Sequence, residues 1–154
     1  MFREMRKKER EINEERARQI LEQGDYGVLS MAGAEGYAYG VPLSYALVGD
    51  VLYFHCAKEG YKLDSITENP QVSFCVVSKA QSLPEQFSMS YESAIGFGTI
   101  DTVGGEEKEA ALFHLIEKYS SDYLEKGRNY VEKSGQRTAV LKLTLEHISG
   151  KAGH

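Results

Sequence analysis

The sequence has no tryptophan and only two cysteines, and it contains no apolar run long enough to cross a bilayer. Cys56 and Cys75 do not form a C-x-x-C pair, so the ligand pattern of a zinc site and the redox pair of a thioredoxin-like protein are both missing. The N-terminus is densely charged and does not resemble a signal peptide. These features predict a cytoplasmic protein with reduced thiols, no metal and no membrane association.

Hydrolase motifs are missing as well. The chain contains no G-x-S-x-G, no H-E-x-x-H and no Walker loop. These absences weigh against a hydrolase and leave the catalytic residues unassigned. They do not weigh against a protein that depends on a bound organic cofactor, because the cofactor then carries the difficult chemistry and the chain only binds and orients it.

Basic residues are fewer than acidic ones. The chain has 18 Lys and Arg against 23 Asp and Glu, a formal net charge of -5, which argues against general nucleic-acid binding. With 154 residues, 42% of them hydrophobic, the chain is long enough for one sizeable core. We therefore expect a single domain over residues 1–154.

The two ends of the chain differ in composition. Residues 1–18 carry seven basic and five acidic side chains, several of them paired at i,i+4, which favours a solvated helix over residues 1–24. A basic arm for nucleic acid is the rival interpretation, but the interleaved glutamates weaken it. The last residues, 149–154, are predicted to form a flexible tail on composition alone.

The chain between these ends alternates in the manner of antiparallel strands. Gly-containing turns separate most of the short apolar runs, and helical periodicity interrupts them near 58–69, after Gly104 and in part of 121–134. The predicted fold class is mainly β (α+β), an antiparallel barrel with peripheral helices. Its six strands are expected near 26–31, 37–47, 51–56, 71–78, 87–103 and 138–148.

One segment, 54–64, combines a strand end, a turn at Gly60 and a helix start. A helix N-terminus offers unpaired N–H groups and the positive end of the helix dipole, so it can bind phosphate, and Lys62 would add a full charge. His55 lies beside this site and is predicted to be a pocket residue. The same pattern also fits an ordinary turn with a solvated lysine.

A second segment, 37–45, has a proline inside a strand-like run. Pro42 cannot donate to a ladder, so the strand must lie at an edge, be bulged, or turn toward a ligand. Gly40 and Ser44 share its face, and Ser44 would supply a hydroxyl to a planar cofactor. An ordinary edge strand explains the pattern equally well.

Several segments, in order along nearly the whole chain, resemble the nitroimidazole-resistance branch of the FMN-binding split-barrel superfamily related to pyridoxamine 5'-phosphate oxidase. Each motif is short, but together and in register they are fairly specific. The segments are M-R-K-K-E-R-E-I (5–12), Y-G-V-P-L-S-Y (39–45), Y-F-H-C-A (53–57), G-Y-K-L (60–63), N-P-Q-V-S-F (69–74), Y-E-S-A-I-G-F-G (91–98) and E-H-I-S-G-K (146–151).

The resemblance implies a six-stranded antiparallel split β-barrel that forms a homodimer with two equivalent FMN sites at the subunit interface. One strand would line the isoalloxazine ring, a strand end and helix start would hold the ribityl phosphate, and a third segment would come from the partner. In that order, the implied residues are Val41, Pro42, Leu43, Ser44 and Tyr45; His55, Cys56, Ala57 and Lys62; and Tyr91 and Ser93.

The implied activity is an FMN-dependent oxidoreductase acting on a small flat or nitroaromatic molecule. Pyridoxamine phosphate oxidation itself is not expected, because the chain lacks tryptophan and an Arg-rich C-terminal segment. A non-catalytic dimer that binds or senses flavin or heme, with His55 near the pocket, is an alternative. A cofactor-free structural dimer is another, although it leaves Gly60, Lys62 and Pro42 without a purpose.

Overall fold

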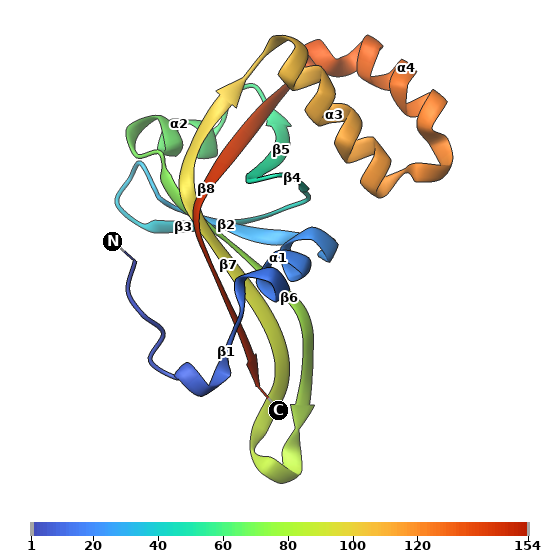
Figure 1. Ribbon diagram of the computed structural model, residues 1–154. Helices are drawn as coiled ribbons and strands as arrows, with labels where there is room; N and C mark the ends of the chain where they lie inside the picture. Colours follow the sequence, from blue (N-terminus) through green and yellow to red (C-terminus); the bar gives the residue numbers. More distant parts are fainter. Residues whose placement is uncertain (1, 154) are drawn as a thin grey trace.

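The computed structural model describes residues 2–153 (Figure 1), and Met1 and His154 lie outside the described residues. The strands are β1 (Glu11–Ile12), β2 (Gly27–Ala32), β3 (Ala38–Leu43), β4 (Ala46–Val48), β5 (Val51–Ala57), β6 (Gln71–Leu83), β7 (Ser88–Val103) and β8 (Thr138–Gly153). The helices are α1 (Glu14–Gln23), α2 (Tyr61–Glu68), α3 (Gly105–Tyr119) and α4 (Leu124–Ser134), and short 3-10 turns lie at Lys8–Arg10, Pro84–Gln86, Ser121–Tyr123 and Gly135–Arg137.

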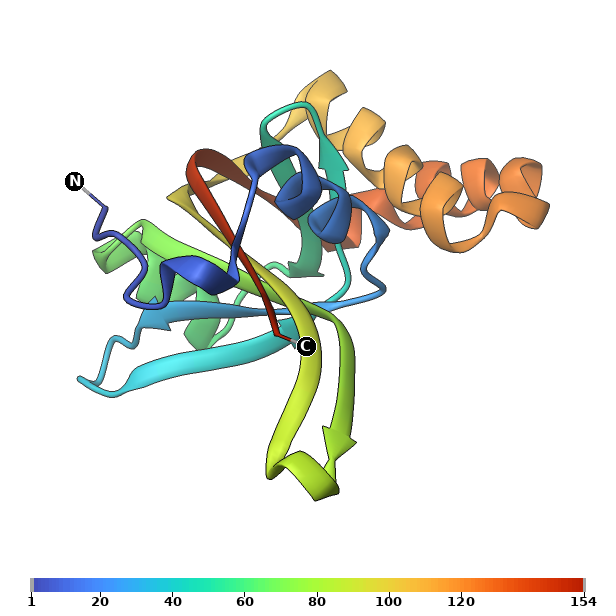
Figure 2. The same cartoon turned by 60° about the horizontal axis from the view of Figure 1, so that its bottom comes forward.

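All eight strands that the structure describes in residues 2–153 belong to one antiparallel sheet. The order across the sheet is β3-β2-β6-β7-β8-β5-β4, with the short β1 beside the end of β8. The sheet twists strongly and leaves β3 and β4 at its two edges (Figures 1 and 2). The expected mainly-β fold with peripheral helices is confirmed.

Three aromatic rings pack together in the core. The Phe74 ring lies 4.8 Å from the Tyr45 ring and 5.0 Å from the Phe54 ring, both edge-on, and all three side chains are fully buried. Edge-to-face contacts of this kind add to the free energy that burial of the rings already contributes. Leucines from β2, β5 and β8 complete this core, among them Leu29, Leu52, Leu141 and Leu143.

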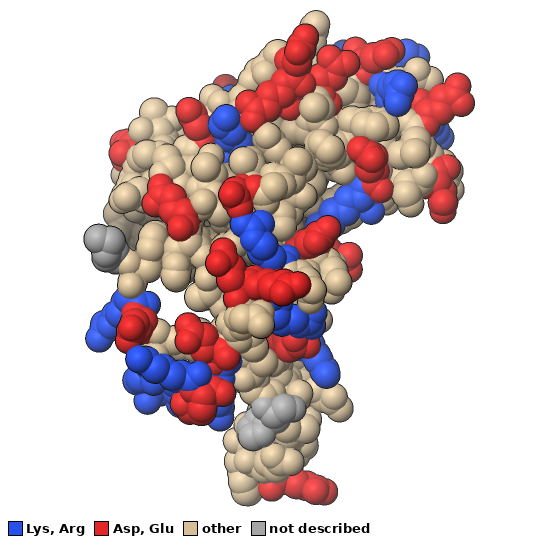
Figure 3. All heavy atoms as spheres, viewed as in Figure 1, with Lys and Arg blue, Asp and Glu red and all other residues tan. Residues whose placement is uncertain are grey.

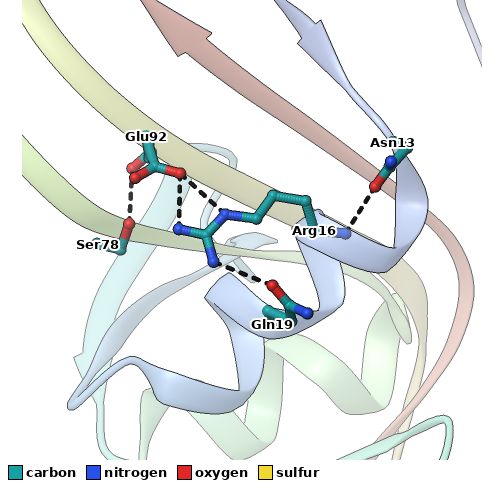
Figure 4. Close-up of polar contacts among 5 residues, drawn as sticks. All are labelled: Asn13, Arg16, Gln19, Ser78 and Glu92. Atoms are coloured by element: carbon teal, nitrogen blue, oxygen red, sulfur yellow. Dashed lines mark hydrogen bonds and ion pairs between the residues drawn. The ribbon is translucent and has the colours of Figure 1, made fainter.

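Helix α1 closes the core by packing on β7 and β8. Asn13 caps its first turn, because the side-chain oxygen of Asn13 accepts a hydrogen bond from the Arg16 N–H at 2.8 Å. The Arg16 guanidinium donates to the Glu92 carboxylate on β7 through two nitrogens, at 2.8 and 3.0 Å (Figure 4). The cap starts the helix, and the ion pair fixes it against the sheet.

Two hairpins extend away from this body (Figures 1 and 2). The ends of β6 and β7 form a two-stranded arm, and α3 with α4 forms a helical hairpin near β4 and β5. The tip of the arm carries Phe87, whose side chain is 98% exposed. A two-stranded ribbon is marginally stable in water, so an arm of this kind gains stability when another surface covers it.

The N-terminal prediction was wrong in extent. The helix begins at Glu14 rather than near residue 1, and residues 2–13 contain only one 3-10 turn and the two residues of β1. The Lys8–Glu4 ion pair forms at 2.9 Å, but both side chains are largely exposed. Exposed i,i+4 pairs contribute a few tenths of a kcal/mol each, about 0.2–0.5 kcal/mol, which does not hold a helix without an apolar face.

The predicted flexible tail was also wrong. Residues 149–153 continue β8 and pair with β7 from Tyr91 to Ile95. Gly150 is required there, because a Cβ atom at this position would lie 2.6 Å from a side-chain carbon of Ile12 and 2.8 Å from the Ala17 Cβ. Small residues that suggested disorder instead allow the N-terminal segment and α1 to approach the strand.

The predicted strand 37–47 is divided in two. β3 ends at Leu43 and β4 begins at Ala46, so the chain crosses from one sheet edge to the other at Ser44 and Tyr45. Tyr45 turns into the core there, and its hydroxyl donates to the Leu21 carbonyl. This crossing and the short β1 account for the two strands beyond the expected six.

Candidate functional site

The start of α2 has the features of an anion site. Gly60 precedes the helix with φ of 146°, a conformation that side chains rarely adopt, and no side chain caps the first turn. The first backbone bond of the helix runs from Asp64 N–H to the Gly60 carbonyl at 3.1 Å. The N–H groups of residues 61–63 therefore precede the helical ladder and are available to an anion.

Lys62 lies in the first turn of α2, and the end of β5 is within range of its charge. Its charge acts on Cys56, lowering the pKa of the thiol against the larger effect of burial, which raises it. The net result is a pKa above the ordinary thiol value, so Cys56 is not activated as a thiolate. Lys62 therefore lies within electrostatic range of Cys56 and is the charged member of the pair.

The end of β5 alternates in direction. His55 and Ala57 are exposed, whereas Cys56 is half-buried and packs against the core. No hydrogen bond to the His55 ring occurs among the described residues 2–153. Of the three neighbouring candidates, His55 and Ala57 are accessible from outside the core and Cys56 is largely covered.

β3 lies at a sheet edge, which is one of the three arrangements that Pro42 left open. Pro42 pairs with Val28 of β2 on one side and needs no ladder bond on the other. Pro42 and Ser44 are exposed, while Val41 and Leu43 pack partly against the core. The exposed and half-buried residues alternate, so this edge offers a ligand both a backbone rim and small side chains.

Tyr45 belongs to the core rather than to a ligand surface. Its ring is fully buried, its N–H donates to the Tyr119 hydroxyl at 3.1 Å, and its carbonyl accepts from Lys118 Nζ at 2.9 Å. Burial raises the pKa of Tyr45 far above its usual value. The resemblance could not distinguish this residue from Ser44, because the crossing that turns Tyr45 inward involves α3, which is distant in sequence.

Tyr91 and Ser93 lie far from the other candidates within one chain. Ser93 pairs with Lys151 of β8, whereas His55 pairs with Val140 near the opposite end of that strand. The intervening stretch of β8 spans roughly 30 Å or more, at about 3.3 Å per residue of extended strand. A single small ligand in one chain cannot reach both groups.

The outer face of the sheet, opposite the core, was missed by sequence reasoning. Val28, Cys75, Ile95 and Ser149 lie opposite one another on β2, β6, β7 and β8. Their neighbours along each strand point into the core, so these four side chains share the outer face. The row is uncharged and composed of small or apolar residues, and only the strand order reveals it.

Charged groups flank the end of this face at Tyr91. The Tyr91 hydroxyl accepts from the Arg10 guanidinium at 3.3 Å, and Lys151 Nζ lies 5.8 Å from the ring centroid. The Arg10 hydrogen bond is the main cause of a lowered pKa for Tyr91. The arm beyond it carries few charged side chains, and its surface in Figure 3 is mostly uncharged.

Within residues 2–153, no three His, Cys, Asp or Glu side chains converge as metal ligands would. None of the helices in this part of the chain has the length and apolar character needed to span a membrane.

Comparison with known proteins places this geometry in a family. The family model described as pyridoxamine 5'-phosphate oxidase matches residues 13–152. No curated protein matches the chain.

Solved structures share the fold over most of the chain. A candidate 5-nitroimidazole antibiotic resistance protein from Bacteroides thetaiotaomicron is 26% identical with a TM-score of 0.79, and the match covers 92% of this chain and 85% of the Bacteroides chain. An FAD-binding protein from Mesorhizobium loti is 21% identical with a TM-score of 0.67, covering 94% and 98%. An FAD and heme binding protein from Mycobacterium smegmatis is 20% identical with a TM-score of 0.78, covering 92% and 72%.

The family match extends from the cap of α1 to Ala152 in β8 and includes the helix start at Gly60 and the edge strand at Pro42. The chain belongs to the pyridoxamine 5'-phosphate oxidase family and has its split-barrel fold.

Proposed function

We propose that this protein binds FMN at the interface of a homodimer and acts as an oxidoreductase on a small flat molecule. The observation that carries the proposal is the uncapped start of α2 beside Lys62, because it is suited to a phosphate group. Family membership and the two FAD-binding structural relatives support a flavin as the molecule that brings the phosphate.

The remaining groups at this end of the sheet fit the rest of a flavin mononucleotide. Ser44 and His55 are exposed with polar atoms, and the rim of β3 at Pro42 offers an edge to a planar ring. A bound flavin supplies two-electron chemistry to a substrate held over its ring. This chain would bind the phosphate through Lys62 and the N–H groups of α2, and would orient the ring between the β3 edge and His55.

Two observations favour a dimer. Ser93 and His55 are too far apart along β8 to meet one flavin in a single chain, so a site that uses both requires a second chain. The outer face around Ile95 and the arm with Phe87 leave apolar surface exposed. A two-fold arrangement in which this face and arm meet the partner would cover that surface and bring Ser93 to the partner's flavin.

His55 supports a second candidate, a heme-binding or heme-sensing dimer. Its ring is exposed and makes no hydrogen bond within the described part of the chain, so a ring nitrogen is available as an axial ligand. The Mycobacterium smegmatis relative that binds both FAD and heme gives this candidate its support.

Reoxidation of the reduced flavoprotein tests the catalytic part of the proposal. The protein is loaded with FMN, desalted, reduced anaerobically with dithionite and mixed with a 5-nitroimidazole. We expect the absorbance of oxidised flavin to return faster than for free reduced FMN at the same concentration. Equal rates would show that the protein binds FMN but does not catalyse this reduction. A Soret band after addition of hemin, with no retained FMN, would favour the heme candidate.

A further inference from the structure

A cavity of about 360 Å³ lies between the helical hairpin and the sheet. Side chains from α3 and α4 form its wall, and residues at the β3 crossing, on β5 and at the start of β8 form its floor. Its size lies at the lower end of the range for small-molecule sites, about 300–1,000 Å³. The lining residues are Ser44, His55, Leu112, Leu115, Ile116, Tyr119, Ser120, Tyr130, Val131 and Thr138.

The cavity has a mainly aliphatic and aromatic wall and a polar floor. Leu112, Ile116 and Val131 face it from the helices, and Ser44, His55 and Thr138 place hydrogen-bonding side chains on the floor. The helical side adds the hydroxyls of Tyr119, Ser120 and Tyr130. No Asp, Glu, Lys or Arg of the described residues 2–153 lines it. A cavity without charged groups selects an uncharged molecule, because burying an unpaired charge is costly.

One aromatic wall is held rigidly in place. The Tyr119 hydroxyl accepts from the Tyr45 N–H at 3.1 Å and donates to the Asp25 carbonyl at 2.6 Å. Both partners are backbone atoms at the edge of the core, so the ring position is set by the fold. The Tyr130 ring on α4 is the second aromatic wall and is 66% exposed.

The cavity adjoins the proposed flavin site but differs from it chemically. Ser44 and His55 belong to both, so a molecule in the cavity would lie next to the flavin ring. The cationic groups suited to a phosphate, Lys62 and the start of α2, do not line the cavity. The cavity therefore suits a second molecule rather than the mononucleotide.

We infer that this cavity is the substrate site, and that it binds an uncharged planar molecule of one or two fused rings with a polar edge. The rings would lie between Tyr119 and the aliphatic wall, and the polar edge would meet Ser44, His55 and Thr138. This inference rests on the proposed function, because it takes the flavin to be bound beside Ser44 and His55.

Binding of coumarin, an uncharged two-ring molecule, tests the inference without measuring activity. Saturation-transfer NMR gives its affinity for the FMN-loaded protein and for the protein without added FMN. We expect binding to both, weakened about three- to tenfold by Tyr130→Ala through loss of an aromatic contact. Tyr123→Ala is the matched control, because Tyr123 is 64% exposed on the same hairpin but does not line the cavity.

A second pair of variants fills the cavity instead of opening it. Leu112→Trp would occupy the space and abolish coumarin binding, whereas Leu124→Trp, outside the lining, would not change it. Equal affinities in both members of either pair would overturn the inference. Loss of coumarin binding on FMN loading would also overturn it, because the flavin ring itself would then occupy the cavity.

The flavin content of the same samples separates this inference from the proposed function. A preparation that keeps FMN through desalting but does not bind coumarin refutes the substrate site alone. A preparation that keeps no FMN but binds coumarin refutes the proposed function and, with it, the role of the cavity as a substrate site.

Discussion

Gly98 on β7 provides a sharp test of how β7 and β8 meet. A Cβ atom at this position would lie 1.9 Å from the carbonyl oxygen of Thr144 and 2.9 Å from its carbonyl carbon. Both are backbone atoms in the neighbouring strand, so they cannot move aside as a flexible side chain would. The register shift between Phe97 and Gly98 places the two strands this close.

The expected cost of Gly98→Ala follows from that contact. Overpacking a well-packed interior costs about 1–3 kcal/mol, and a backbone clash lies at the upper end, so we expect a loss of about 3 kcal/mol or more. Set against a typical total of about 5–15 kcal/mol, this is a large fraction of the free energy of unfolding. For a chain of this size it corresponds to a fall in Tm of about 6–12 °C.

Urea unfolding followed by far-UV circular dichroism measures the change, at one fixed protein concentration because a dimer would make stability concentration-dependent. Gly135→Ala is the matched control. Gly135 has helical φ and ψ of -60° and -31°, and its nearest neighbour to an added Cβ is a Leu112 carbon at 3.6 Å. We expect that variant to be unchanged or about 0.4–1 kcal/mol more stable.

A Gly98→Ala protein as stable as the unsubstituted chain would refute the reasoning. The register on either side of the shift would then be wrong, and with it the placement of Ser93 and Ile95 on the outer face. The proposed contribution of a partner chain to the flavin site depends on that placement.

Three other predictions follow from individual contacts. Lys62→Ala should weaken FMN binding about ten- to hundredfold in equilibrium titrations, since a charge-assisted phosphate contact contributes about 1.5–3 kcal/mol, while Lys126→Ala on the exposed face of α4 should leave the affinity unchanged. A double-mutant cycle over Arg16→Ala and Glu92→Gln should give a coupling of about 0.2–1 kcal/mol in urea unfolding, because the pair is partly exposed, and zero coupling would contradict the anchoring of α1. Burial lowers the pKa of Lys118 from 10.5 to about 8, so the unfolded chain holds more protons than the folded one between these values and stability should rise with pH across this window. The free energy of unfolding of the unsubstituted protein, measured relative to that of Lys118→Met, should therefore be larger at pH 10 than at pH 7. A smaller difference at pH 10 would show that the sign is wrong.

The sequence predicted those parts of the fold that depend on local pattern. Alternation located β2, β5 and β7, and the i, i+3, i+4 spacing of Leu112, Leu115 and Ile116 located α3. The Gly60 turn also followed from local chemistry and is confirmed, and Pro42 limited its strand to an edge, a bulge or a turn toward a ligand, of which the structure shows the edge. These features need only the preferences of neighbouring residues.

The errors occurred where a distant segment decides the local structure. Residues 149–153 form a strand because β7 pairs with them, although their composition suggested a flexible tail. Tyr45 is buried because α1 and α3 supply partners for its hydroxyl and backbone. The separation of Ser93 from His55 also depends on strand order, so the residue pattern alone could not show it. Only the family resemblance implied that Tyr91 and Ser93 come from a partner chain.

The central claim is that this chain holds FMN, and an absorbance spectrum tests it most directly. The spectrum of the purified protein is recorded before and after incubation with FMN and desalting, with bound flavin quantified against protein. We predict retained flavin bands and about one FMN per chain, as two equivalent sites in a homodimer require. A desalted protein without flavin bands would contradict the account and leave the split barrel without its proposed function.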